Sequence, residues 1–187
     1  MTVRANKPEF NIREKLKSLD YAQVPYEKIP DGVAIQTVIE QYKISGAANE
    51  HETTSNSYQP SYFKVTISPK FTNSIIEIKS APNHKEYGSA VYHNIAVYRS
   101  IDGGDYSYIG DTFSNGQMTL GWTTGGTIYS IVPILVYDTP NTTLPVTYKL
   151  YHRHSGGSQN VRLGENGGDE FMSATEIKGS SSSITKL

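Results

Sequence analysis

From residue 33 onward, apolar and polar residues alternate in short runs that are separated by turn residues. Residues 61–69 place Phe63, Val65 and Ile67 on one face, and residues 145–155 place every second residue from Val146 to His154 on one face. A period of two is the pattern of a half-buried β-strand. Further runs that predict strands are residues 33–43, 74–82, 89–101, 106–110, 127–138, 159–164 and 170–178.

Eight to ten short strands separated by turns, with no second helix, predict an all-β fold: an antiparallel β-sandwich or jelly roll over residues 33–179. Residues 127–138 are the most apolar stretch and are expected to form a central strand, with Pro133 at a bulge or a non-bonding position. Residues 45–59 are polar and predict a long surface loop, and residues 180–187 predict a flexible tail.

Residues 1–32 do not alternate and predict an extended arm that carries one short helix. Asn11 is a candidate N-cap with Glu14 at the reciprocal position, and Ile12, Leu16 and Leu19 form a narrow apolar stripe. A helix this short is unstable alone in water, so the stripe needs a surface to pack against. That surface is either the protein's own β-domain or another protein. We favour the second, because the stripe is thin and residues 24–32 form a proline-containing, stiff connector.

Composition and charge restrict the classes of partner that the chain is expected to bind. The chain has 187 residues, of which 36% are hydrophobic and 19% charged, with 14 tyrosines, no cysteine and a net charge of −1. This near-neutral balance favours neither nucleic acid nor an anionic membrane as a partner. No apolar run is long enough to span a bilayer, and no secretory signal peptide is visible. A polar, tyrosine-rich chain suits half-exposed strands and wet interfaces.

Candidate chemistry is sparse. His152 and His154 lie two residues apart in a predicted strand and could ligate a metal with a third ligand, or they could simply continue an inner face. His51, His84 and His93 fall in or near predicted loops and have no ligand spacing. The glycine-rich acidic turns at 102–105 and 166–170 suit either calcium or a tight turn. No nucleophile, phosphate-loop or dinucleotide motif is present, so we expect no enzymatic activity and no cofactor.

Aromatic residues near strand ends and loops form the candidate ligand-facing tip. Its members are Asp102, Asp105, Tyr106, Tyr108 and Trp122. Aromatic rings beside polar groups can stack on sugars, whereas the ordinary alternative is that tyrosines fill the sandwich core and subunit interfaces.

Two sets of residues resemble bacteriophage structural proteins. The run VTISPKFTNSIIEIKS, then NIAVYRS, YSIVPILVYDTPNTTLPVTYKLYHR and SATEIKG, resembles compact β-domains of phage virion proteins over about residues 60–179. Such domains look like the C1q/TNF jelly roll, and the resemblance implies a homotrimer. The opening phrase, carried by Arg4, Lys7, Pro8, residues 11–16, Leu19 and Asp20, is similar to the start of structural proteins from phages of aquatic bacteria, especially cyanophages. There it precedes varied β-domains, which implies a docking tag.

Together these features predict a virion structural protein: a homotrimeric knob on the outside of a phage particle, as a capsid decoration or cement protein or a short fibre. The partners would be the chain itself and a major capsid, tail or portal-vertex protein, and the protein would be made in the host cytoplasm. The expected docking residues are Pro8, Phe10, Ile12, Arg13, Lys15, Leu16 and Leu19. The alternative is a receptor-binding tail-fibre knob that recognises a cell-surface glycan or protein; the absence of a shaft-like repeat favours the first function.

Overall fold

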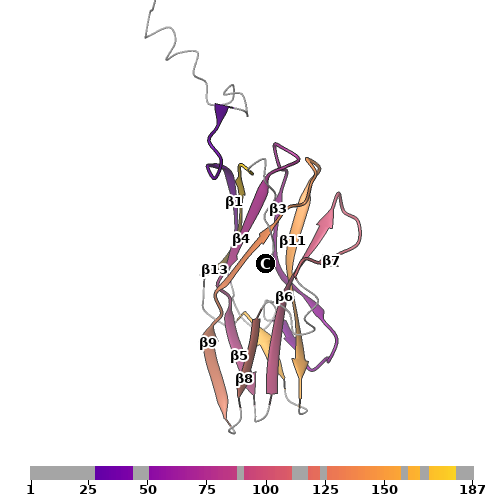
Figure 1. Ribbon diagram of the computed structural model, residues 1–187. Helices are drawn as coiled ribbons and strands as arrows, with labels where there is room; N and C mark the ends of the chain where they lie inside the picture. Colours follow the sequence, from indigo (N-terminus) through magenta and orange to yellow (C-terminus); the bar gives the residue numbers. More distant parts are fainter. Residues whose placement is uncertain are drawn as a thin grey trace, which may run out of the picture.

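The computed structural model describes residues 28–43, 51–87, 91–110, 118–122, 126–156, 160–164 and 169–179, which form thirteen β-strands (Figure 1). Within these residues no helix is long and apolar enough to cross a membrane. The strands in chain order are β1 (Ala34–Lys43), β2 (His51–Thr53), β3 (Gln59–Ile67), β4 (Ile75–Ser80), β5 (Asn83–Tyr87), β6 (Val91–Ile101), β7 (Ser107–Tyr108), β8 (Met118–Trp122), β9 (Thr127–Ile131), β10 (Ile134–Asp138), β11 (Val146–Ser155), β12 (Val161–Leu163) and β13 (Asp169–Ile177).

The strands pair into three antiparallel sheets. One sheet has the order β1-β13-β4-β10, and a small sheet has the order β2-β12-β5-β9. The remaining sheet has the order β3-β11-β6-β7, with β8 also paired to β6. Strands from the start of the chain therefore lie beside strands from its end, as β1 does beside β13 and β3 beside β11. This is the jelly-roll arrangement, so the predicted all-β antiparallel fold is confirmed.

The first two sheets are joined by one long ladder. Ser80 pairs with Ile134 and Asn83 pairs with Ile131, so β4–β5 and β10–β9 keep the same register across the gap between the sheets. Pro82 and Pro133 lie in this gap, and the backbone N–H of Val132 donates to the carbonyl of Pro82 (3.0 Å). Proline has no N–H for a ladder bond, which explains why the pairing is interrupted there without any shift of register. The two sheets thus form one continuous layer.

The core lies between this layer and the β3-β11-β6-β7 sheet. Residues of β11 alternate strictly between buried and half-buried positions along the whole strand. Their buried side chains, Val146, Tyr148 and Leu150, pack with Phe63 from β3 and Ile78 from β4. Burying such side chains is the main stabilising term of the sandwich, at roughly 1.5–3 kcal/mol each.

Three expectations from the sequence need correction. Residues 127–138 do not form a central strand: β9 and β10 are each the last strand of their sheet order. The predicted loop at 45–59 contains β2, which pairs with β12, and the start of β3. His51, His84 and His93, which were expected in or near loops, lie on the strands β2, β5 and β6. These misses share a cause, because short strands are fixed by distant partners more than by their own sequence.

Candidate functional site

All five histidines of the chain lie in strands β2, β5, β6 and β11, and four of them are in mutual contact. Nδ1 of His51 contacts Nε2 of His152. The other ring nitrogen of His152, Nδ1, lies 2.8 Å from Nε2 of His93. The ring of His93 is tilted against that of His84, with centroids 4.8 Å apart. We name His51, His152, His93 and His84 the histidine chain.

The alternation of each strand explains why these side chains meet. On β11, His152 and His154 continue the inward-facing series of Val146, Tyr148 and Leu150, as the sequence predicted. His154 lies opposite His93 in the β6–β11 ladder. On β5, His84 and Glu86 face inward between half-buried neighbours. The space between the layers is therefore filled mainly by aliphatic side chains with Phe63 and Tyr148 at one end and by imidazoles at the other.

Burial keeps the histidine chain neutral. Burial lowers the pKa of His152 to about 3, with further contributions from His51 and His84. Burial alone lowers the pKa of His84 to about 4. The pKa of His93 is well below its usual value, first because of burial and then because of the neighbouring histidines. A neutral imidazole has one donor and one acceptor nitrogen, which is what a chain of N–H···N bonds requires.

The pKa of Glu86, at the same end of the sandwich, is shifted in the opposite direction. Burial raises its pKa to about 7, so near neutral pH a large share of this carboxyl is protonated. Its residue is only 4% exposed. Protonation avoids the cost of burying a carboxylate.

The histidine chain does not form a metal site in the described part of the structure. Both ring nitrogens of His152 already contact other histidines. No group of three His, Cys, Asp or Glu side chains among the described residues is arranged to hold a metal ion. His152 and His154, the candidate ligands, therefore share a face without acquiring a third ligand there.

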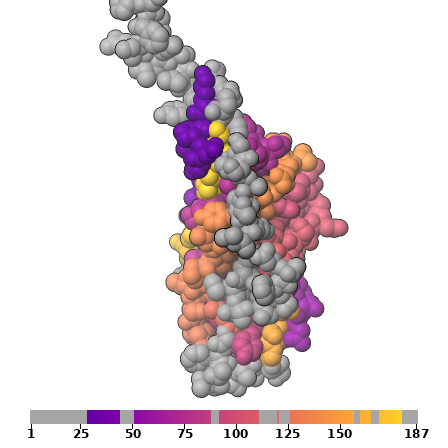
Figure 2. Space-filling view, viewed as in Figure 1, coloured from indigo at the N-terminus to yellow at the C-terminus, as the bar shows by residue number. Residues whose placement is uncertain are grey.

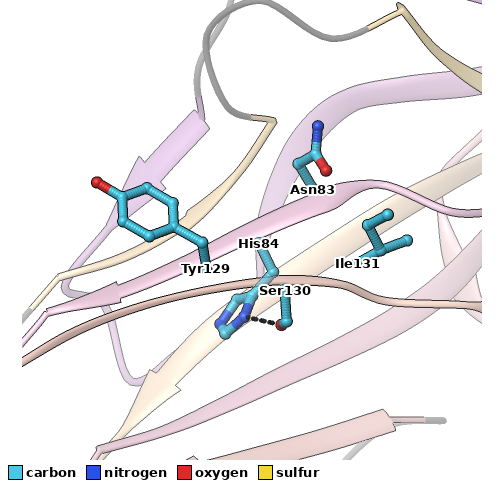
Figure 3. A pocket seen from close by; sticks show the side chains of 5 residues that line it. All are labelled: Asn83, His84, Tyr129, Ser130 and Ile131. Atoms are coloured by element: carbon cyan, nitrogen blue, oxygen red, sulfur yellow. Dashed lines mark hydrogen bonds between the residues drawn. The ribbon is translucent and has the colours of Figure 1, made fainter.

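A pocket of about 290 Å³ lies where β5 meets β9 and is lined by Asn83, His84, Tyr129, Ser130 and Ile131 (Figure 3). The ring of His84 points to Ser130, with Nδ1 at 2.9 Å from Oγ. A serine beside a histidine can be a nucleophile with its base. Here the other nitrogen of His84, Nε2, has no hydrogen-bond partner among the described residues, and a base with a pKa of about 4 is weak at neutral pH. The geometry does not support catalysis.

The most apolar stretch of the sequence carries an exposed surface along its whole length. Exposed and less exposed positions alternate without a break from residue 127 to residue 138. The exposed fractions are 61% for Tyr129, 67% for Ile131, 55% for Leu135 and 47% for Tyr137. Figure 2 shows part of this stretch in orange on the surface. We name Tyr129, Ile131, Pro133, Leu135 and Tyr137 the exposed ribbon; it extends ~30 Å along the edge of its layer.

The predicted tip residues divide between two places. Asp102 and Asp105 are exposed on the turn between β6 and β7, and Tyr108 pairs with Tyr98 in the adjoining ladder. The backbone of Trp122 pairs with Val91 at the other end of β6. Seven residues of strand separate the two places, which corresponds to ~23 Å.

Tyr106 and Tyr108 each lie against a further tyrosine, and of these two partners only Tyr151 was not singled out from the sequence. The ring of Tyr106 lies against Tyr151, and that of Tyr108 against Tyr98, with centroids 5.8 and 5.7 Å apart. A sequence signal for Tyr151 did exist. It follows from the same alternation that turns Leu150 and His152 inward, since Tyr151 must then point outward.

The expected docking residues of the arm, Pro8, Phe10, Ile12, Arg13, Lys15, Leu16 and Leu19, lie outside the described residues. The predicted tail at 180–187 does as well. Their roles stay predictions from the sequence.

Comparison with known proteins gives no family. No family model and no curated protein matches the sequence. A chain in the structure of infectious bursal disease virus, Gx strain, is similar with a TM-score of 0.39 and 10% identity over 79% of this chain and 38% of the viral one. A chain of the T13 viral particle of that virus has a TM-score of 0.39 and 10% identity, with 79% of this chain and 36% of the other covered.

Eiger TNF from S. frugiperda is similar with a TM-score of 0.37 and 4% identity, over 81% of this chain and 99% of the other. The chain thus spans well under half the length of the viral chains. TM-scores and identities this low support neither a shared family nor a function.

Proposed function

We propose that this chain is a virion structural protein, a homotrimeric knob on the outside of a phage particle that its N-terminal arms anchor. The observation that carries the proposal is the exposed ribbon. Four large apolar or aromatic side chains in one continuous stretch are each 47–67% exposed. Contiguous exposed apolar surface of this kind marks a protein contact.

The position of the ribbon favours side-chain packing over strand pairing between copies. β9 and β10 are edge strands, and an edge strand can pair with another chain. Pro133 interrupts this edge and removes a donor from its middle. Copies of the chain would therefore meet through the faces of their sheets.

A second apolar area lies on the same outer face of this layer, near its opposite edge. Ile39 on β1 is 59% exposed and Phe171 on β13 is 39% exposed. Ile39 pairs with Ser173, Ser173 pairs with Lys79, and Lys79 pairs with Leu135. Side chains at paired positions point to the same face of a sheet, so both apolar areas belong to one outer face. Two different patches on one subunit suit a heterologous contact, which forms a ring when the rotation between subunits closes. The resemblance to phage β-domains makes the ring a trimer.

The arms would provide the attachment. The apolar stripe of Ile12, Leu16 and Leu19 would dock on a capsid, tail or portal-vertex protein, with Arg13 and Lys15 beside it. Three arms on one knob raise the effective concentration of each arm after the first has bound, which turns weak docking into firm attachment. A decoration or cement protein on the capsid is the form of this function that we favour.

Replacing the ribbon tests the trimer. Ile131→Lys combined with Leu135→Lys should convert a trimer to a monomer in light scattering coupled to size-exclusion chromatography, because it places two charges in the buried contact. Leu144→Lys is the matched control, since Leu144 is 50% exposed but lies in a turn outside the ribbon. A wild-type protein that runs as a monomer at all concentrations would disprove the trimer.

Deleting residues 1–24 tests the anchor separately. The truncated protein should still form the trimer but should no longer bind purified particles, and Leu16→Asp in the full chain should do the same without changing the melting temperature. Binding as strong as that of the full chain would exclude the arm. A large fall in melting temperature for Leu16→Asp would show instead that the helix packs on its own domain.

A further inference from the structure

Five tyrosines cover the outer face of the β3-β11-β6-β7 sheet. Tyr98 is central: its ring centroid lies 4.2 Å from that of Tyr151, 5.7 Å from Tyr108 and 5.9 Å from Tyr58. Tyr106 extends the row beyond Tyr151, at 5.8 Å. We name Tyr58, Tyr98, Tyr106, Tyr108 and Tyr151 the tyrosine face. The rings are tilted by 31–56° to one another; Tyr106 is exposed to solvent and the other four are half-buried.

Cations lie among these rings. Nζ of Lys149 is 5.8 Å from the ring centroid of Tyr106, and Cζ of Arg153 is 4.9 Å from that of Tyr58. Lys149 is directly opposite Lys64 in the β3–β11 ladder. Like charges at directly opposed positions destabilise a sheet. Burial and then Lys64 lower the pKa of Lys149, which records this repulsion.

Charge is divided unequally between the two layers. The strands β3, β6, β7, β8 and β11 contain no Asp and no Glu, and they contain Lys64, Arg99, Lys149 and Arg153. Of these cations, Arg99 is neutralised by Asp138, at 2.8 Å. The strands of the other layer carry the acidic residues, such as Glu77 and Glu176. A chain with a net charge of −1 therefore has one aromatic face with local positive charge.

We propose that the tyrosine face binds an acidic oligosaccharide. Sugar rings would stack on the tyrosines while their carboxylate or sulfate groups approach Lys64 and Lys149. Tilted tyrosine rings offer apolar area together with hydroxyls that can bond sugar hydroxyls. The row is long enough for more than one sugar ring. The inference does not depend on the proposed function, because the exposed ribbon lies on the opposite layer.

A saccharide fits this face better than single-stranded nucleic acid does, although both can stack on aromatic rings. A nucleic acid carries a charge at every residue and needs a groove of cations along its path. Here Asp102 and Asp105 are exposed on the turn beside Tyr106, where they would repel a phosphate chain. An acidic sugar chain of lower charge density avoids that cost.

The experiment is calorimetry of the full-length protein with acidic oligosaccharides that carry charge on only some of their sugars (singly sialylated and singly sulfated) and with neutral maltohexaose. At least one acidic member should bind more tightly than maltohexaose, and added salt should weaken its binding. Tyr106→Ala with Tyr151→Ala should weaken it about tenfold or more. Lys149→Gln should weaken it less, and only for acidic sugars.

Tyr92→Ala is the matched control, because Tyr92 is 49% exposed on the same strand as Tyr98 but six residues away. The Tyr92→Ala variant should leave the affinity unchanged. If the double tyrosine variant does not fold, Lys149→Gln still tests the proposal. Failure of every acidic sugar to bind would overturn the proposal. So would binding that Lys149→Gln leaves unchanged, or displacement of the sugar by a single-stranded oligothymidylate that binds the same face more tightly.

Discussion

The two ends of the sandwich interior are filled in different ways. At one end Phe63, Val65, Ile78 and Tyr148 form a dry core. At the other end the histidine chain fills the same space between the same two layers. The strand β11 contributes to both ends, through Tyr148 and Leu150 and then through His152 and His154.

Polar groups are also handled differently at the two ends. In the apolar end, the hydroxyl of Tyr148 donates to Asp138 (2.9 Å), which also accepts from Arg99 (2.9 and 2.8 Å). These partners satisfy one another. The ring contacts of His152 with His51 and His93 need neutral imidazoles, because a protonated imidazole has no acceptor. The apolar end should therefore provide stability, and the histidine end should make that stability depend on pH.

The largest expected effect breaks the apolar end. Phe63→Ala should lower the free energy of unfolding by about 3–5 kcal/mol, because it removes a fully buried ring that packs edge-on against Tyr42. Urea unfolding at neutral pH measures this loss. A loss below about 1 kcal/mol would show that the site collapses around the cavity and that the core is not the main source of stability.

The next largest effect is the pH dependence of stability, which should distinguish the histidine end from the apolar end. His84 and His152 have a pKa of about 4 and about 3 in the folded protein, below the usual 6.5, so the unfolded chain binds their protons more readily. The stability that these two histidines contribute should be complete above pH 6.5. It should fall on acidification towards their folded-state pKa values, by up to about 1.4 kcal/mol per pH unit for each histidine. Glu86, whose pKa is raised from 4.5 to about 7, opposes this between those two values, because the folded protein keeps its proton.

Unfolding free energies measured from neutral pH to acid test this directly. We expect a net loss of about 1–2 kcal/mol between pH 6.5 and pH 5 from His84, His152 and Glu86 together. The double variant His84→Gln with His152→Gln should have a shallower pH dependence, and Phe63→Ala should keep the wild-type slope. Equal slopes for the wild type and the double variant would refute a role of the histidine end in acid sensitivity.

The smallest effect concerns one hydrogen bond at the histidine end. Ser130→Ala removes the contact between Oγ and Nδ1 of His84 and should cost about 1 kcal/mol. Thermal melting measures it, with Ser107→Ala as a control, since the Ser107 hydroxyl donates a long bond of 3.4 Å at the surface. A loss as small as the control's would mean that the His84 ring is held by its contact with His93 alone.

Much of the fold follows from alternation in the sequence. The strands at 61–69, 74–82, 89–101, 145–155 and 170–178 were each predicted within a few residues of β3, β4, β6, β11 and β13. The shared inward face of His152 and His154 was predicted for the same reason. The edge position of residues 127–138 was not, because an apolar stretch reads as buried unless its neighbours are known. In the structure, every second side chain of this stretch points away from the core, and no described residue buries these side chains.

The sequence by itself determined which side chains of each strand share a face, since a strand turns successive residues to opposite sides. Only the tertiary structure decided which faces meet. His51 and His152 are 101 residues apart, and His93 and His152 are 59 apart, so their contacts depend on strand pairing across the whole chain. The tyrosine face likewise gathers Tyr58, Tyr98 and Tyr151 from separate segments, and each segment alone shows no more than an outward-facing tyrosine.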